Sequence, residues 1–260
     1  MKKCFVLLVA AAMLAGYSAF ASDSLDATKA IRSQSAWFRT GEAYTYEMIY
    51  STIGIEFKVA SGTLTVKKES YDGKEGYLSI VQGQPGKFFA KLFPLSYESR
   101  LYLNHEKKPV HFYRDFKEGK VNGFEQFDYD WQHRKIHVQS LTKNSGAQDY
   151  ISDMRAWTMD FNSIYLVLRN FDENELVEGM EISPVVLLSG EEIGCTISYK
   201  GRNPDNSDFV FSIVIKNGKG IYLRNGIPTE FIISSEPDHH LVSMELPVPL
   251  GRVRFRLLSQ

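Results

Sequence analysis

Apolar and polar residues alternate along most of the chain from Ala43 onward. The alternating runs are short, rich in aromatic and β-branched residues, and bounded by turn residues, as in half-buried strands. In the first half, the predicted strands lie within residues 43–68, 76–82, 97–103, 109–116, 124–131 and 134–141. Their spacing of about ten residues predicts an antiparallel meander, because βαβ units need a helix between strands.

The segment 142–160 loses the alternation and links two β-rich halves. In the second half, the predicted strands lie within residues 181–188, 192–201, 208–218, 229–237, 241–248 and 251–258. In the last of these, Val253, Phe255 and Leu257 alternate with arginines, which predicts one face toward the core and one toward solvent.

The stretch "DFNSIYLVLRNF", residues 160–171, follows a helical period, with Asp160 as a plausible N-cap. One face would carry Phe161, Ile164, Tyr165, Val167, Leu168 and Phe171, and the other Asn162, Ser163, Arg169 and Asn170. A stripe that wide must be buried. We therefore expect Ile164, Tyr165 and Leu168 to point into the fold, and Asn162 and Asn170 to face water.

These elements predict an all-β fold with one central helix. A long antiparallel sheet twists and curls, so we expect a curled or barrel-like sheet. The amphipathic helix would pack on this sheet from outside or lie in it as a lid or plug. The predicted domain spans residues 22–260, with its two β halves joined near 142–172.

The first 21 residues have the features of a cleaved secretory signal peptide. Lys2 and Lys3 precede an apolar run too short to span a bilayer, and Ala19-Phe20-Ala21 forms an A-x-A cleavage site. The mature chain would begin at Ser22 in the periplasm. Without the two lysines, 28 basic residues stand against 31 acidic ones, a formal charge of −3. Scattered charge of this kind indicates no nucleic-acid partner, and we expect contact with the envelope to be peripheral at most.

Four stretches resemble the bacterial exported family known as domain of unknown function 3108 (DUF3108). They are "GEAYTYEMIYSTIGIEFKVASGTLTV", "KPVHFYRDFKEG", the helix "DFNSIYLVLRNF" and the ending "FIISSEPDHHLVSMELPVPLGRVRFRLL". The resemblance covers nearly the whole mature chain and implies an all-β envelope protein with one helix and no established activity. Family members often carry a cysteine in the region that reads "GRNPDNSDFVFSIVI" here, so a shared thiol site is not expected.

The only dense cluster of potential metal ligands is "EPDHH", Glu236–His240. It could hold zinc or copper, but a structural site needs about four converging ligands. Pro237 and Asp238 form turns readily, so we expect a polar turn and no metal or cofactor. Cys195 alternates with Ile193 and Ile197, which predicts a buried, inert thiol.

No catalytic motif is present: the chain lacks G-x-S-x-G, H-E-x-x-H and G-x-x-x-x-G-K-[ST]. We therefore expect no enzyme and no catalytic residues. The alternative is a hydrolase of an envelope polymer, with carboxylates such as Glu98, Asp115 or Asp128 facing each other across a cleft.

The segment "PGKFFAKLFPL", residues 85–95, interrupts the strands and is either a flap at a barrel mouth or a small piece of core. If the curled sheet encloses a cavity, its candidate lining residues are Phe88, Phe89, Phe93, Ile164, Tyr165 and Leu168. Such a cavity would suit a lipid or another apolar or amphipathic ligand. We expect a periplasmic protein that binds such a ligand or supports cell-envelope assembly. A third hypothesis is a structural partner that presents an exposed sheet edge. The sequence leaves the oligomeric state open.

Overall fold

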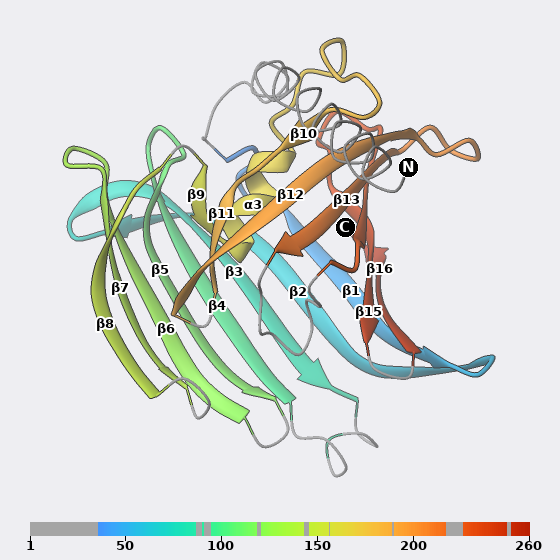
Figure 1. The fold of residues 1–260 in the computed structure, drawn as a ribbon, viewed down its shortest axis with the longest axis horizontal. Coiled ribbons are helices and arrows are strands. Elements are labelled where there is room, and N and C mark those ends of the chain that lie inside the picture. Colours follow the sequence, from blue (N-terminus) through green and yellow to red (C-terminus); the bar gives the residue numbers. More distant parts are fainter. Residues whose placement is uncertain are drawn as a thin grey trace, which may run out of the picture.

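A computed structural model describes residues 36–86, 90, 95–118, 121–142, 146–155, 157–188, 190–216, 226–248 and 251–260 (Figure 1). Within them, sixteen strands form one sheet around a single described helix, α3. The strands are β1 Ala43–Thr52, β2 Ile55–Tyr71, β3 Lys74–Pro85, β4 Leu95–Asn104, β5 Pro109–Glu118, β6 Val121–Asp130, β7 Lys135–Thr142, β8 Gly146–Asp153, β9 Thr158–Asp160, β10 Glu181–Ile182, β11 Val185–Leu188, β12 Glu191–Arg202, β13 Phe209–Lys216, β14 Thr229–Ile233, β15 Leu241–Val248 and β16 Gly251–Ser259. The predicted all-β class with one central helix is confirmed.

The order of the strands is that of two meanders joined by their ends. It runs β8-β7-β6-β5-β4-β3-β2-β1-β16-β15-β14-β13-β12-β11-β9, with β10 added beside β12. Neighbours are antiparallel, as predicted, except for the parallel pair β9–β11. Residues 45–51 of β1 pair with residues 252–259 of β16, so the two halves form one continuous sheet.

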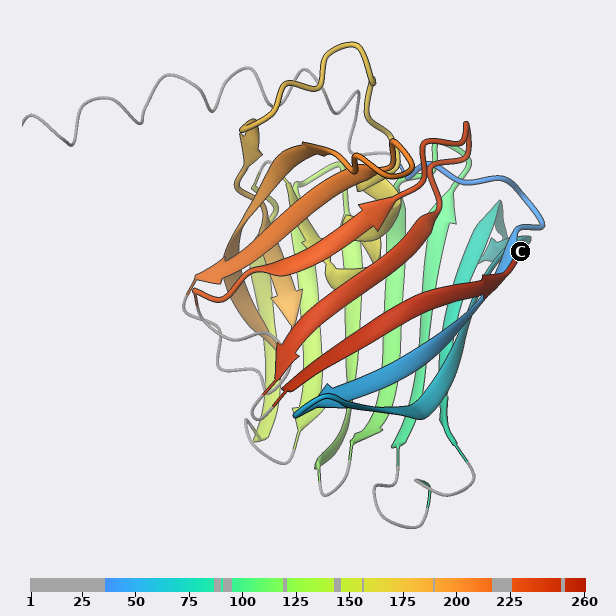
Figure 2. The ribbon, with the colours of Figure 1, turned by 90° about the vertical axis from the view of Figure 1, so that its right-hand side faces the viewer.

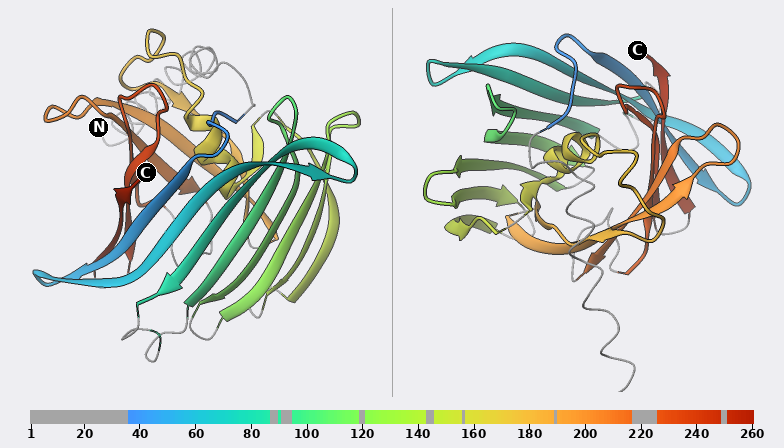
Figure 3. Two further views of the ribbon diagram at one scale, coloured as in Figure 1. Left: turned by 180° about the vertical axis from the view of Figure 1, so that it is seen from behind. Right: turned by 90° about the horizontal axis from the view of Figure 1, so that it is seen from above.

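The sheet curls until its two ends approach each other (Figures 2 and 3). Among the described residues, side-chain hydrogen bonds connect β8 to Gly190 and to the start of β12. The hydroxyl of Tyr150 donates to the carbonyl of Gly190 at 3.1 Å, and that of Ser152 to Glu192 at 2.6 Å. The result is a barrel-like wall with a seam between β8 and the start of β12.

Helix α3, Phe161–Leu168, lies inside this wall (Figures 1 and 3). Asp160 caps it as predicted, because its carboxylate accepts from the backbone N–H groups of Asn162 and Ser163, both at 2.9 Å. Every helical side chain that the structure describes is buried. The sequence left open whether the helix packs outside the sheet or lies within it, and the structure supports a helix within the curled sheet.

The prediction that Asn162 faces water is wrong. Its side chain is buried and its amide donates to the hydroxyl of Ser99 on β4. Arg169, also placed on the polar face, is buried as well, while Asn170 is only half-buried. The helix is surrounded, so its polar face finds hydrogen-bond partners in the protein, as buried polar groups must.

The segment 142–160 contains two strands that the loss of alternation concealed. β8 continues the first meander, and β9 leads directly into α3. Most β8 side chains are exposed or half-buried, so the strand shows no apolar face by which to recognise it. The junction between the halves is thus itself part of the sheet.

Candidate functional site

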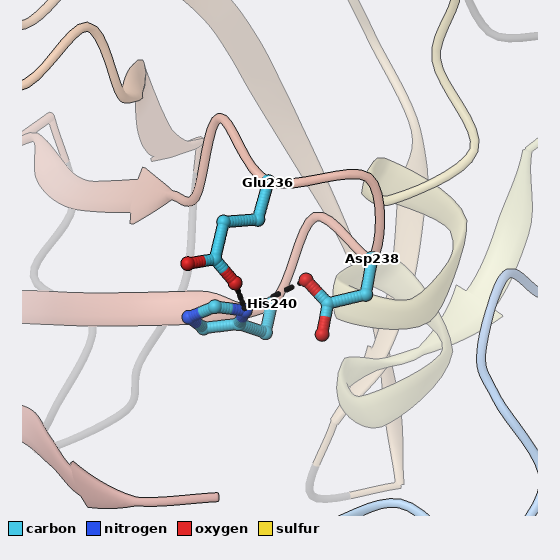
Figure 4. Close-up of side chains that lie close together, drawn as sticks. All are labelled: Glu236, Asp238 and His240. Atoms are coloured by element: carbon cyan, nitrogen blue, oxygen red, sulfur yellow. Dashed lines mark hydrogen bonds and ion pairs between the residues drawn. The ribbon is translucent and has the colours of Figure 1, made fainter.

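The turn between β14 and β15 brings three potential metal ligands together (Figure 4). Nδ1 of His240 lies 2.8 Å from an oxygen of Asp238 and 3.9 Å from an oxygen of Glu236. The three ligand atoms lie within 4.8 Å of one another. Asp238 and His240 are buried, whereas the Glu236 side chain is 65% exposed. The predicted polar turn is therefore present, and its acidic and histidine side chains converge.

Backbone hydrogen bonds hold this turn in shape. The N–H of Ser234 donates to the carbonyl of His240 at 2.8 Å, and that of His239 to the carbonyl of Glu236 at 2.9 Å. His239 has a left-handed backbone with φ of 46°, which few residues other than glycine adopt. This conformation lets the neighbouring histidines serve different surroundings: His240 stacks on Tyr44, while His239 stacks on Phe171.

Arg169 ties the turn to the helix and to the first strand. Its guanidinium forms two bonds to the carboxylate of Glu42, at 2.6 and 2.9 Å, and both side chains are at most 4% exposed. It also donates twice to the backbone carbonyl of Asp238, at 3.1 and 2.8 Å. One buried cation therefore joins three segments that are far apart in the sequence.

Tyr44 holds the side-chain carboxylate of Asp238. Burial raises the pKa of Tyr44 above its usual range, so its hydroxyl stays protonated and donates to Asp238 at 3.0 Å. Burial alone would also raise the pKa of Asp238, but hydrogen bonds from His240 and Tyr44 outweigh it and lower that pKa. Asp238 is thus a fixed carboxylate anion at neutral pH.

A pocket of about 320 Å³ opens beside this turn, on the side of His239. Its lining combines three apolar residues with polar and charged ones. They are Trp37, Phe171 and Pro237, and Arg169, Asn170, Asp172, Glu173, Asn174 and His239. The helix end and the extended segment 36–39 meet here, since the N–H of Trp37 donates to the carbonyl of Leu166 at 2.9 Å.

The charged groups of the pocket are held in place. His239 contacts the carbonyl of Arg169 and the carboxylate of Glu173 through its two ring nitrogens, each at 3.1 Å. Burial acts to raise the pKa of Glu173, but hydrogen bonds from His239 and Arg202 lower it. The pocket therefore presents an ordered carboxylate and imidazole beside an aromatic ring, an arrangement suited to a ligand with polar and apolar parts.

A second polar cluster lies on the inner face of the first meander. Ser99, Arg114, Glu125 and Ser140 stand side by side across β4 to β7, and all four are buried. The row of residues two positions along is apolar and consists of Leu101, Phe112, Phe127 and Val138. Asn162 of α3 bonds to the polar row through Ser99. The polar face of the helix is thus matched by a polar row on the wall.

Three of the six candidate cavity residues belong to the described part of the chain. Ile164, Tyr165 and Leu168 are buried among core side chains, at 2, 8 and 1% exposure, so they pack against protein. Tyr165 also accepts the backbone N–H of Leu241 at 3.1 Å. None of the three lines the pocket beside the turn. Phe88, Phe89 and Phe93 lie outside the described residues.

The candidate acids of the hydrolase alternative lie on the outer face of the sheet. Glu98 and Asp115 are cross-strand neighbours that point to the same side of β4 and β5, and Asp128 bonds to His111 at 2.6 Å. Hydrogen bonds from Gln82 and Arg100 lower the pKa of Glu98, the opposite of what a proton donor needs.

The predicted buried thiol is present. Cys195 is 2% exposed, and burial raises its pKa to about 12, which makes it a poor nucleophile. His133 and His137 do not converge, because His133 bonds to Asp130 and His137 to Asp149.

Arg169, Glu42 and Trp37 are the site residues that sequence reasoning missed. Arg169 was assigned to the polar side of the helix, and the other two precede the first strand. The only signal in the sequence was that Arg169 directly follows a strongly apolar helix, a position where a charge is either solvated or paired. Its partner Glu42 lies 127 positions away, so no local pattern could identify it.

The family model for the protein of unknown function DUF3108 matches residues 45–257, which include the curled sheet, the helix and the turn. The chain belongs to the DUF3108 family. This confirms the resemblance drawn from the four sequence stretches. No curated protein matches the chain.

Among solved structures, this DUF3108 chain is similar to a β-barrel-like protein of the DUF1849 family from Brucella abortus. The two share 11% identity at a TM-score of 0.51, over 86% of this chain and 98% of that one. At that identity the likeness shows the fold alone.

Two weaker likenesses carry no argument. One is a DUF1089 family protein from Pseudomonas aeruginosa, at a TM-score of 0.29, 8% identity, 82% of this chain and 92% of that one. The other is a candidate exported protein with a YmcC-like fold from Bacteroides fragilis, at 0.28, 9%, 85% and 97%. Among the described residues, no helix has the length and apolar character needed to cross a bilayer.

Proposed function

We propose that this DUF3108 protein is a non-enzymatic, exported protein that binds an amphipathic ligand in the pocket beside the β14–β15 turn. The observation that carries the proposal is the mixed lining of that 320 Å³ pocket, in which Trp37 and Phe171 lie beside fixed polar groups. The volume is at the lower end of small-molecule sites. It fits the head group of a lipid or a glycolipid, with any acyl chain outside. Binding such a molecule would serve assembly of the cell envelope.

The placement of reactive side chains supports a non-enzymatic role. Cys195 is buried with a raised pKa, and Glu98, Asp115 and Asp128 lie on the convex face. Hydrolysis of a polymer requires two carboxylates on opposite sides of the substrate, a geometry these three acids do not form.

The proposed place of action is the periplasm. The N-terminal basic pair, apolar run and A-x-A site support export with cleavage after Ala21. N-terminal sequencing of protein from the periplasmic fraction should begin at Ser22. Recovery of a chain that still carries Met1 in the membrane pellet would contradict this part of the proposal.

Native mass spectrometry of the mature protein, taken directly from periplasm, tests the binding role. The expected spectrum shows the protein with an added mass that dissociates on activation and is then identified by fragmentation. Trp37→Ala should lose this mass, because it removes the larger of the two aromatic side chains that line the pocket.

Ile227→Ala provides the matched control. Ile227 is 37% exposed, as is Trp37, but it does not line the pocket. The control should retain the added mass. Absence of any bound mass in the wild-type protein, or its survival in Trp37→Ala, would overturn the proposal.

A further inference from the structure

We propose that Glu236, Asp238 and His240 form a binding site for a divalent transition-metal ion, with zinc as its representative. The site lies next to the pocket but uses other side chains, so it stands or falls independently of the proposed ligand. One imidazole and two carboxylates form a donor set that zinc accepts in proteins.

The spacing of the donor atoms fits a metal ion. With bonds of 2.0–2.2 Å, tetrahedral zinc holds its ligand atoms roughly 3.3–3.6 Å apart. The separations from His240 Nδ1 to Asp238 and to Glu236, 2.8 and 3.9 Å, lie on either side of that range. Glu236 is 65% exposed and can adjust, whereas Asp238 and His240 are fixed by burial. Figure 4 shows the two carboxylates facing the same ring nitrogen.

Residues behind the ligands support them as the outer shell of a metal site does. Tyr44 donates to the second oxygen of Asp238 at 3.0 Å and stacks on the His240 ring at 5.5 Å. The amide nitrogen of Gln260 lies 3.1 Å from Nε2 and 3.4 Å from Nδ1 of His240, so it covers the ring without lying in line with either nitrogen.

Metal binding would move the ring proton of His240. Without metal, Nδ1 of His240 lies 2.8 Å from the carboxylate of Asp238, so an N–H there donates to that anion. With metal on Nδ1, the ring carries its proton on Nε2.

The number of ligands defines the kind of site. Three protein ligands leave a fourth position for water, as in open zinc sites, whereas closed structural sites have four protein ligands. The sequence analysis expected no metal because it required the four protein ligands of a closed structural site. The ion would bind reversibly at the rim, where Glu236 faces solvent.

Isothermal titration of the mature, EDTA-treated protein with zinc chloride tests this site. We expect one zinc per chain. His240→Gln should weaken binding by more than ~100-fold, and Tyr44→Phe by about 10–100-fold, the usual loss when the group behind a ligand is removed. Glu236→Gln should also weaken binding at least ~10-fold, and its exposed position makes misfolding a poor explanation for any loss.

Two variants control for the chemistry of the neighbourhood. His239→Gln changes the adjacent histidine, which faces the pocket, and Glu230→Gln changes an exposed carboxylate on β14. Both should bind zinc as the wild type does. Absence of stoichiometric binding, unchanged affinity in Glu236→Gln and His240→Gln, or an equal loss in His239→Gln would overturn the proposal.

Discussion

Two buried arginine–glutamate pairs, one within the first meander and one between the helix end and the residue before β1, show how differently the same interaction can be built. Arg114 and Glu125 are direct neighbours on β5 and β6, with a closest contact of 2.6 Å. Arg169 and Glu42 come from the end of α3 and the start of the first meander, 127 positions apart. Both pairs are nearly excluded from solvent.

The difference lies in what else each arginine holds. The Arg114 guanidinium lies over the ring of Phe116 at 4.3 Å, and Glu125 accepts the buried backbone N–H of Gly190 at 3.0 Å. Arg169 instead binds the carbonyl of Asp238, and Glu42 also accepts the backbone N–H of Arg39 at 2.9 Å. The first pair lies on strands that backbone pairing already aligns, and adds one hydrogen bond to the turn between β11 and β12. The second joins the end of the helix, the residue before β1 and the turn that carries the candidate site.

The largest effect is expected for Arg169→Met. The substitution leaves the Glu42 carboxylate buried without its cation, which typically costs about 3–5 kcal/mol of unfolding free energy. Urea unfolding measures the loss. Arg155→Met is the control, because Arg155 is 67% exposed and its contact with Glu192 is long, at 3.6 Å. The control should lose under ~1 kcal/mol. Equal losses would erase the distinction between the Arg169 pair and an ordinary surface pair.

Leu168→Ala asks whether the helix end that supports Arg169 is packed core or the wall of a ligand cavity. Leu168 is 1% exposed among core side chains, so a loss of about 2–5 kcal/mol is expected. Asn170→Ala, two residues on and half-buried at the pocket, should lose under ~1 kcal/mol. Unfolding of both variants with and without extracted lipid provides the comparison. Similar small losses would mean that the helix is peripheral.

Asn162→Ala tests the hydrogen bond between the helix α3 and strand β4 of the first meander. The substitution removes the donor to Ser99, whose hydroxyl is fully buried, and should cost about 1–3 kcal/mol. Gln132→Ala, in the exposed turn between β6 and β7, serves as a control that should stay within about 0.5 kcal/mol. A cost at Asn162 no larger than the control would restore the sequence-based prediction that this face meets water.

The smallest effect is expected when both charges of the first pair are removed. Arg114→Met with Glu125→Gln should stay within about 1.5 kcal/mol of the wild type, because the two buried charges disappear together and the glutamine oxygen still accepts the N–H of Gly190. Arg169→Met with Glu42→Gln should remain about 1–3 kcal/mol less stable, since the Asp238 carbonyl loses its donor. Chemical denaturation of the two double variants is the measurement, and equal behaviour would contradict the comparison.

Features set by local patterns could be predicted from the sequence, whereas contacts between distant segments could not. Alternation around Phe112 and Phe127 located the strands of the first meander, because a strand with one buried face shows its period directly. Asp160 was recognisable as a cap because capping is local. β8 escaped detection since few of its side chains are buried.

The site was only partly predictable, for a related reason. Glu236, Asp238 and His240 stand within five positions, so their cluster was visible, and so were the turn formers. Arg169 and Trp37 reach the site through contacts between distant segments. A helix enclosed on every side also defeats the usual inference that its polar face meets water, because the surrounding wall supplies the partners.

The central claim is that α3 is held inside the curled sheet from all sides and fixes the rim where the site lies. Hydrogen–deuterium exchange of the native protein tests it directly. The amides of residues 164–169 should exchange only through global unfolding, with the same protection as those of Phe112 and Phe127 in the wall. Exchange of the helix amides far ahead of the wall, through local opening, would contradict the claim.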